Sequence, residues 1–354
     1  MITRLPMKPH KLPFLNDYMY ACHPQILKQM AALADTPHTG YGCDELCEAA
    51  REKIRQACQC PEAGVHFLIG GTATNVTAID ALIRSYQGVL AAQSGHINTF
   101  EAGAMESAGH KILPLRPIEG KVMPHILSEW LERDKNDENR DHTVRPGALY
   151  ISQPTEIGSM YSKKELQDLY AVCQEAGLYL FIDGARLGYV LGAPDNDMTP
   201  ADLAANCDVF YIGGTKCGLL FGEAVVITND EIKPDFRTIA KQCGAIMAKG
   251  RLLGVQFGAA FTDDLYTRIC AKGTQQALKI KQALLDCGFK FVTDSPTNQQ
   301  FVIMTPAQFA KLSEEFALSH IAYLPDGNYS VRICTSWATD DAQVDKLIAM
   351  IKEL

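Results

Sequence analysis

The chain has 354 residues, of which 47% are hydrophobic and 21% are charged. These are ordinary globular values, which exclude disordered, collagen-like and coiled-coil chains, and at about 150 residues per domain the length fits two domains. Lysine and arginine number 33 against 41 acidic residues, so the net charge is −8. This charge predicts no nucleic-acid or anionic-membrane partner.

The N-terminal segment is interrupted by Pro6, Pro9 and Pro13 and has no apolar stretch typical of a secretory signal. No apolar run approaches the roughly 20 residues that a membrane helix needs. Twelve cysteines are scattered singly, apart from Cys58 and Cys60. We therefore expect a cytoplasmic protein with reduced thiols, without disulfides and without a bound metal.

Short apolar runs alternate with helix signals through the first two thirds of the chain. Most runs lack a two-residue alternation of apolar and polar residues, which favours strands buried on both faces of a parallel sheet. The expected strands are Val65–Ile69, Val89–Ala92, Ala148–Ser152, Leu178–Ile182, Val209–Ile212 and Ala224–Ile227.

Helix signals lie between these strands. Ser162 and Glu165 have the spacing of a capping box, and Gly177 marks the end of the apolar stripe that follows. Thr199 before a proline and Asp44 before another apolar stripe predict two further helix starts. The alternation predicts a large, doubly wound, mostly parallel α/β domain, with the polar stretch 134–142 as a solvated loop.

The pattern changes after Gly250. Long helical segments run from about Arg251 to Cys287. The last part predicts a strand, a helix, a strand and a helix at Gln300–Met304, Pro306–Leu318, Tyr329–Thr335 and Asp340–Lys352. We expect an N-terminal segment with the large domain over residues 1–250 and a small α+β domain over residues 251–354.

The segment Gly70–Asn75 (GGTATN) follows a predicted strand and opens a helix. Such a turn can bind phosphate, because the N–H groups at a helix N-terminus and the helix dipole attract anions. The segment has neither the spacing of the dinucleotide motif nor the Gly-Lys-Ser/Thr ending of the Walker A motif. An ordinary turn capped by Thr72 is the alternative.

Two motifs end neighbouring strands. Asp183 begins DGAR at the carboxyl end of a strand, where α/β sheets bind ligands, and a carboxylate there can keep a ring nitrogen protonated. Lys216 lies in GGTKCG after the next strand, where an amine with a lowered pKa can form a Schiff base. The alternatives are a helix cap and a loop lysine.

Two single residues are further candidates. His96 follows the strand Val89–Ala92, where its ring could stack on a planar cofactor, although a lone histidine is more often structural. Arg332 alternates with Val331 and Ile333, so it could grip a carboxylate in an interdomain cleft or lie at the surface. Together, a phosphate cradle, a stacking ring, a carboxylate and a lysine are what a pyridoxal phosphate (PLP) enzyme requires.

The sequence resembles the threonine aldolases, within the beta-eliminating lyase group of fold type I PLP enzymes, which have the aspartate aminotransferase-like fold. The resemblance runs from Asn16 to the C-terminus, and four segments carry it: GGTATN, SGHINTFEAGA, FIDGARLGYVLG and GGTKCGLLFGEAVV. It implies a lyase with PLP as cofactor. It also implies a homo-oligomer, a dimer or a homotetramer, in which two subunits build each active site.

The resemblance also implies roles for residues of this chain. Lys216 would form the Schiff base, Asp183 would pair with the ring nitrogen, and His96 would stack on the ring. The phosphate would lie on the segment that contains Gly71, Thr72 and Ala73, and Thr215 would contact the cofactor. The groups near the substrate carboxylate would be Asn16, Arg186 and Arg332, and Arg186 would contact the cofactor as well.

One departure from the family concerns the substrate hydroxyl. Many threonine aldolases have a histidine after the strand that precedes the aspartate strand, whereas this chain has Gln153-Pro154-Thr155-Glu156 there. The identity of the base and the side-chain preference therefore stay open. A branch with GGTK and a Thr-Glu segment includes aldolases that act on aromatic β-hydroxy amino acids.

These observations predict a PLP-dependent aldolase that cleaves an L-β-hydroxy-α-amino acid, of the threonine, allo-threonine or phenylserine type, to glycine and an aldehyde. One alternative is another PLP reaction on the same scaffold, such as β-elimination or transamination. A second is a catalytically silent ligand-binding protein of this fold, against which the presence of both Asp183 and Lys216 argues.

Overall fold

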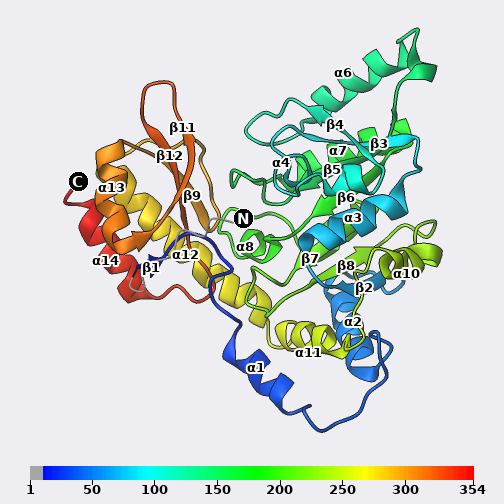
Figure 1. Ribbon diagram of the computed structural model, residues 1–354, viewed down its shortest axis with the longest axis horizontal. Helices are drawn as coiled ribbons and strands as arrows, with labels where there is room; N and C mark the ends of the chain where they lie inside the picture. Colours follow the sequence, from blue (N-terminus) through cyan, green and yellow to red (C-terminus); the bar gives the residue numbers. More distant parts are fainter. Residues whose placement is uncertain (1–10) are drawn as a thin grey trace.

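The structure is a computed structural model that describes residues 11–354. Its largest feature is a seven-stranded sheet with the strand order β2-β8-β7-β6-β5-β3-β4 (Figure 1). The strands are β2 (Gly64–Leu68), β3 (Gln87–Ala92), β4 (Lys111–Leu115), β5 (Arg145–Ser152), β6 (Tyr179–Asp183), β7 (Val209–Gly213) and β8 (Glu223–Ile227). All six strands predicted for this domain are present, with ends that differ by at most three residues.

The sheet is parallel except at β8, which runs antiparallel to both of its neighbours, β2 and β7. The mostly parallel, doubly wound architecture is therefore confirmed. Strand β4 was not predicted. It lies at the sheet edge, exposed and buried residues are mixed along it, and it contains Pro114, which cannot donate a ladder hydrogen bond. A search for continuous apolar runs misses a strand of this kind.

Helices cover both faces of the sheet. One face packs against α3 (Gly71–Leu82) and α10 (Lys233–Gln242), and the other against α2 (Glu45–Ala57), α7 (Lys163–Ala176) and α11 (Arg251–Ala260). Successive residues of one strand enter different cores, because side chains alternate across a sheet. Leu149, for example, belongs to the core under α7, and Tyr150 to the core under α3.

The predicted helix starts are confirmed. Ser162 Oγ accepts from Glu165 N at 3.2 Å and Glu165 Oε2 accepts from Ser162 N at 2.8 Å, so α7 has a complete capping box. Asp44 caps α2, and Thr199 caps α9 (Pro200–Ala205). The predicted loop 134–142 is shorter than expected, because α6 (Pro124–Lys135) enters it and a 3-10 turn occupies Arg140–His142.

The smaller unit is an antiparallel sheet of three strands in the order β11-β12-β9, covered by helices (Figure 1). Its elements are α12 (Leu265–Asp286), β9 (Gln299–Met304), α13 (Pro306–Glu315), β11 (Ser319–Tyr323), β12 (Tyr329–Cys334) and α14 (Asp341–Ile351). The predicted helix to Leu318 ends earlier, because β10 (Phe316–Ala317) pairs with β1 (Leu12–Pro13). Strand β11 was not predicted.

The N-terminal segment belongs to the packing of the small unit. Phe14 is fully buried in its core, beside Val331 and Ile333 of β12 and the second half of α12. Helix α11 and the first half of α12 pack instead on the large domain. The division into residues 1–250 and 251–354 stays a prediction.

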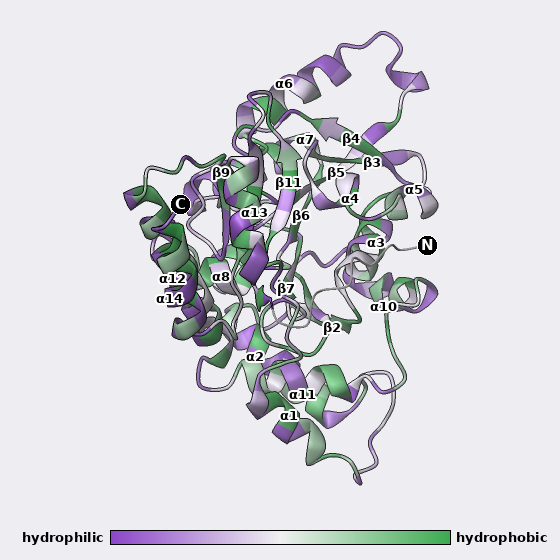
Figure 2. Cartoon of the chain, turned by 60° about the vertical axis from the view of Figure 1, so that its left-hand side comes forward, coloured by the Kyte–Doolittle hydropathy of each residue, from purple (hydrophilic) through white to green (hydrophobic). Residues whose placement is uncertain are grey.

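The remaining helices are α1 (Pro24–Ala31), α4 (His96–Thr99), α5 (Ala104–Ser107) and α8 (Leu187–Leu191). Surface helices such as α10 and α14 carry both hydrophobic and hydrophilic residues (Figure 2). In residues 11–354 no helix combines the length and the apolar character that crossing a membrane requires.

Candidate active site

A cavity of about 370 Å³ lies where β5, β6 and β7 end and α3 begins. It is lined by residues that follow these strand ends together with Tyr18 of the N-terminal segment. Seven predicted site residues line it: Gly71, Thr72, His96, Asp183, Arg186, Thr215 and Lys216. Ala73, Asn16 and Arg332 do not line this cavity.

Asp183 is buried at the end of β6 and receives hydrogen bonds on both carboxylate oxygens. Tyr211 OH, at 2.5 Å, and the Ala185 N–H, at 2.9 Å, donate to Oδ1. Tyr150 OH, at 2.6 Å, and Asn75 Nδ2, at 3.2 Å, donate to Oδ2. Burial raises the pKa of Asp183, but the tyrosine hydrogen bonds and the charge of His96 outweigh it and hold the pKa below its ordinary value.

Two glycines bring the loop of Asp183 against the loop of Lys216. A Cβ on Gly184 would lie 1.9 Å from the Tyr211 carbonyl oxygen, and one on Gly213 would lie 2.2 Å from the Ala185 carbonyl oxygen. The Gly213 N–H donates to the Gly184 carbonyl at 2.9 Å. The glycines in DGAR and GGTK are therefore required by this close approach.

Lys216 lies beyond the end of β7 with its side chain in the cavity. Burial, and then the positive charge of Arg186, lower its pKa, although Asp17, Asp183 and Glu223 act in the opposite direction. Within residues 11–354 its amine forms no ion pair. A lysine of this kind is a better nucleophile at neutral pH than a solvated one.

Glu223, on β8, holds the loop that carries Lys216. Its Oε2 accepts from the Gly214 N–H at 2.7 Å, and its Oε1 accepts from Thr215 Oγ1 at 2.8 Å. Burial raises the pKa of Glu223 to about 7, despite these hydrogen bonds and the charge of Lys216.

His96 is held at both its ring and its backbone. Ring atom Nδ1 lies 2.8 Å from Oε1 of the buried Glu101, which favours the tautomer with hydrogen on Nδ1. The backbone N–H of His96 donates to Glu156 Oε1 at 2.8 Å. Asn75 Nδ2 donates to Glu101 Oε1 at 2.7 Å and also reaches Asp183, so it connects the two acids.

The other end of the cavity is the N-terminus of α3. Gly70 precedes the helix without a side-chain cap, and a Cβ at this position would meet no atom within 4 Å. The N–H groups of Gly71, Thr72 and Ala73 belong to the first turn, where helix geometry provides no partner. This end can therefore accept an anion.

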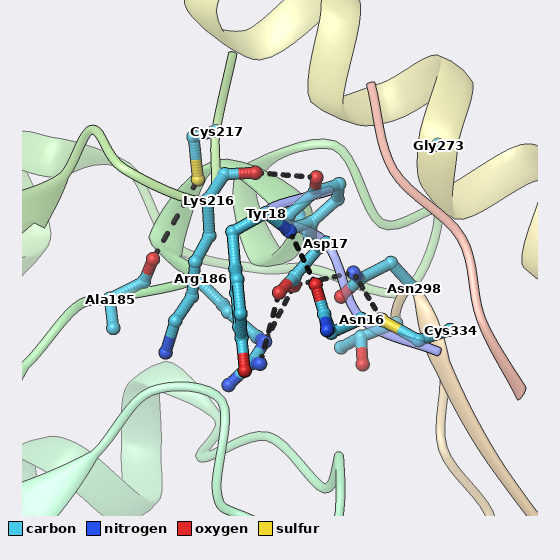
Figure 3. Close-up of polar contacts among 12 residues, drawn as sticks. Asn16, Asp17, Tyr18, Ala185, Arg186, Lys216, Cys217, Gly273, Asn298 and Cys334 are labelled. Carbon is cyan, nitrogen blue, oxygen red and sulfur yellow. Dashed lines mark hydrogen bonds and ion pairs between the residues drawn. The ribbon is translucent and has the colours of Figure 1, made fainter. Parts of the chain in front are cut away.

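Arg186 is tied to the N-terminal segment rather than free in the cavity. Its Nε and Nη2 donate to Asp17 at 2.7 and 3.1 Å, and Asn298 Nδ2 donates to the same carboxylate at 2.9 Å. The side chains of Tyr18, Arg186 and Lys216 extend in the same direction in Figure 3, and all three line the cavity. In the described chain, Nη1 is the nitrogen of Arg186 without a hydrogen bond.

Asn16 and Arg332 lie beside this cluster. Asn16 Oδ1 accepts from the Tyr18 N–H at 3.1 Å. Arg332 is partly buried, its Nη2 donates to the Leu15 carbonyl at 3.0 Å, and its Nε is buried without a hydrogen-bond partner in residues 11–354. Val331 and Ile333 enter the small core on the opposite face, as the alternation predicts.

Sequence analysis missed Tyr150, Tyr211, Glu101 and Glu223. The tyrosines lie on β5 and β7, which flank the aspartate strand. A hydroxyl-bearing ring within an otherwise apolar buried strand needs a hydrogen-bond partner, and this is the signal that could have found them. Glu223 gave a similar signal, since it begins a fully buried strand.

The chain matches the model of the beta-eliminating lyase family over residues 14–307. The low specificity L-threonine aldolase of a Pseudomonas species is 30% identical over 348 residues, which cover 96% of each chain. The low specificity L-threonine aldolase of Pseudomonas aeruginosa is 30% identical over 355 residues, which cover 98% of this chain and 99% of the relative.

Solved structures similar to this chain point to the same family as the sequence relatives. A threonine aldolase of Leishmania major superposes with a TM-score of 0.93 at 42% identity, covering 96% of this chain and 98% of the other. Aspartate aminotransferase of Thermus thermophilus, at 15% identity, superposes with a TM-score of 0.70, over 97% of this chain and 91% of the other, which shows the common fold.

The fold is thus that of the fold type I PLP-dependent enzymes. The chain belongs to the beta-eliminating lyase family and, within it, to the threonine aldolase group of lyases. The resemblance drawn from the sequence motifs is confirmed.

Proposed function

We propose that the protein is a PLP-dependent aldolase that cleaves an L-β-hydroxy-α-amino acid, such as threonine, allo-threonine or phenylserine, to glycine and an aldehyde. The observation that carries this proposal is the meeting of Asp183 and Lys216 in one cavity, in a chain similar to threonine aldolases over nearly its whole length.

The residues fit PLP at three points. Asp183, with a lowered pKa, supplies a charged acceptor for a ring N–H, which would replace the longest of its four hydrogen bonds, from Asn75. Lys216 supplies an amine with a lowered pKa for the aldehyde carbon. The open start of α3, with Gly71, Thr72 and Ala73, supplies N–H groups for the phosphate.

The bound cofactor would supply an electron sink for the bond that breaks at the substrate Cα. Residues of the protein would position the cofactor and the substrate. His96 is fixed by Glu101 so that its ring can cover the cofactor face, and Thr215 orients the lysine loop. Arg186, which lines the cavity and is positioned by Asp17, would face the substrate carboxylate, with Arg332 and Asn16 beside it.

A product assay tests the function. Purified protein with PLP should release glycine and an aldehyde, at a ratio of one to one, from at least one member of a panel of β-hydroxy amino acids. Pyruvate and ammonia instead would indicate β-elimination, and formation of a keto acid from an added amino donor would indicate transamination. A protein with no absorption band from bound cofactor would be a silent binding protein.

We further propose a cytoplasmic homo-oligomer with active sites shared between subunits. Large apolar side chains at or beside the cavity are unusually exposed in the single chain, with exposed fractions of 54% for Tyr18 and 69% for Phe100. All twelve cysteines are free thiols, which suits a reducing compartment. Light scattering at several protein concentrations would distinguish a dimer or tetramer from a monomer.

A further inference from the structure

Three carboxyl groups line the cavity, and in two of them both oxygens already accept hydrogen bonds from the protein. Asp183 has two donors on each oxygen, and in the proposed function it serves the ring nitrogen. Glu223 has one donor on each oxygen, and both donors belong to the loop of Lys216. Every carboxylate oxygen of these two groups therefore already accepts at least one hydrogen bond from the protein.

Glu156 differs from both. Its Oε1 accepts two hydrogen bonds, from Ser152 Oγ at 2.6 Å and from the His96 N–H at 2.8 Å. No other side chain in the described part of the chain donates to its Oε2. The residue is partly buried and lines the cavity. One oxygen thus fixes the carboxyl group, and the second is available to a bound molecule.

The surroundings of Glu156 favour proton uptake. Burial, and then the nearby charge of Asp183, raise its pKa, and the hydrogen bonds from Ser152, from its own backbone N–H and from His96 offset this only in part. The other titratable groups that face it are Tyr150 and Tyr161. A carboxylate with a raised pKa is a stronger base than a solvated one, which suits general-base catalysis near neutral pH.

We propose that Glu156 is a catalytic residue that accepts the β-hydroxyl proton of the substrate at Oε2. This inference rests on the proposed aldolase function. The O–H bond breaks, its proton binds Oε2, and its electron pair becomes the second C–O bond of the aldehyde. The Cα–Cβ bond breaks at the same time, and its electron pair stays with the glycine half, which gains one proton. Glu156 then returns its proton to solvent, so the overall reaction is balanced.

Glu156→Gln tests this assignment. Its amide oxygen can keep the hydrogen bonds to Ser152 and His96, whereas an NH₂ group replaces the free oxygen and cannot take a proton. We expect kcat for cleavage of L-threonine or phenylserine, whichever the wild type cleaves faster, to fall by about 10²–10⁴-fold. Glu129→Gln, on the exposed side of α6, is the matched control and should keep wild-type turnover.

Two measurements separate catalysis from structural damage. Exchange of the glycine α-proton in D₂O, followed by NMR, requires the site with PLP bound, but glycine has no β-hydroxyl group. Glu156→Gln should therefore change the exchange rate by less than about threefold. The affinity of the apo variant for PLP, measured by fluorescence titration, should change as little. Glu156→Asp should recover part of the cleavage rate, with activity still lost as the pH falls.

Three outcomes would overturn the assignment. Near-wild-type cleavage by Glu156→Gln would place the proton on another group, with His96 as the first candidate. An equal loss of cleavage and glycine exchange would make Glu156 structural, as would a large loss of PLP affinity. A wild-type protein that exchanges the glycine proton but cleaves no β-hydroxy amino acid would refute the aldolase function itself, which is a distinct result.

Discussion

The side of the site proposed for the cofactor and the side proposed for the substrate carboxylate are held in different ways. On the cofactor side, Asp183 receives four hydrogen bonds from three neighbouring strands or their loops and from α3, and Lys216 lies on a loop fixed by Glu223. On the carboxylate side, Arg186 is fixed by Asp17. Arg332 is held less completely: its Nη2 donates to the Leu15 carbonyl and to Ser319 Oγ, and its buried Nε has no partner within residues 11–354.

The difference separates a preorganised region from one that a ligand completes. Oriented donors that need no rearrangement stabilise charge more strongly than mobile ones, so the cofactor side should bind PLP with little movement. A buried arginine nitrogen without a partner is costly, and a substrate carboxylate near it would remove that cost. Substitutions on the first side should therefore affect the chemical step, and substitutions on the second should affect substrate binding.

The largest effect is expected for Lys216→Ala, which removes the amine that would hold the cofactor. Turnover should fall by several orders of magnitude while the chain still folds. Borohydride treatment of the wild type, followed by peptide mapping, should find the pyridoxyl group on Lys216. Lys249→Ala, on an exposed side chain, is the control and should retain activity. A label on Lys241 or Lys249 would refute the assignment.

Asp183→Asn should have the next largest effect. The amide has nearly the same shape but no charge, so it no longer favours the protonated ring nitrogen. We expect kcat to fall by at least about 100-fold and the affinity for PLP by much less. Asp208→Asn, the same change in a buried aspartate that accepts from Leu180 N at 2.7 Å, should cost stability but not kcat. Near-native turnover of the Asp183 variant would contradict the proposed role.

The sequence predicted the cofactor side of the site better than the carboxylate side. Asp183 and Lys216 follow buried apolar runs directly, and the carboxyl ends of parallel strands meet at one edge, so local sequence placed both in one site. The pairing of Arg186 with Asp17 joins residues 169 positions apart. It depends on the N-terminal segment lying along β12, where Cys334 N donates to the Phe14 carbonyl at 2.9 Å, and no local pattern indicates that path.

The strands of the fold also differ in how well the sequence predicted them. Strands buried on both faces were predicted to within a few residues, because their apolar runs are continuous. The edge strands β4 and β11 were missed, since half-exposed strands have mixed composition and depend on one neighbour for pairing. The antiparallel direction of β8 is set by the path of the loop before it, which the apolar pattern of the strand does not encode.

Arg332→Ala tests the carboxylate side. Loss of a charge-assisted, two-point contact should weaken L-amino acid binding by on the order of 2–5 kcal/mol, seen as a raised KM. Arg332→Lys keeps the charge but not the planar fork, so it should be damaging to a smaller extent. The absorption band of the bound cofactor should not change. An amino alcohol analogue without the carboxylate should bind both variants almost as well as the wild type, and equal weakening of the two ligands would contradict the idea.

Glu223→Gln should have the smallest effect, on stability rather than on binding. Because the folded pKa of Glu223 is about 7, well above its ordinary value of 4.5, the folded chain retains a proton that the unfolded chain releases as the pH rises. This contribution to stability is fully present below pH 4.5 and is lost as the pH approaches and passes 7. A glutamine does not titrate, so the wild-type apoprotein should lose about 3 kcal/mol relative to the variant between acidic pH and pH 8. Urea unfolding at fixed protein concentration, with exposed Glu129→Gln as the control, measures this difference. Parallel stability curves for wild type and Glu223→Gln would mean that the carboxyl group is ionised throughout, and the loop of Lys216 would then be held by a permanent charge.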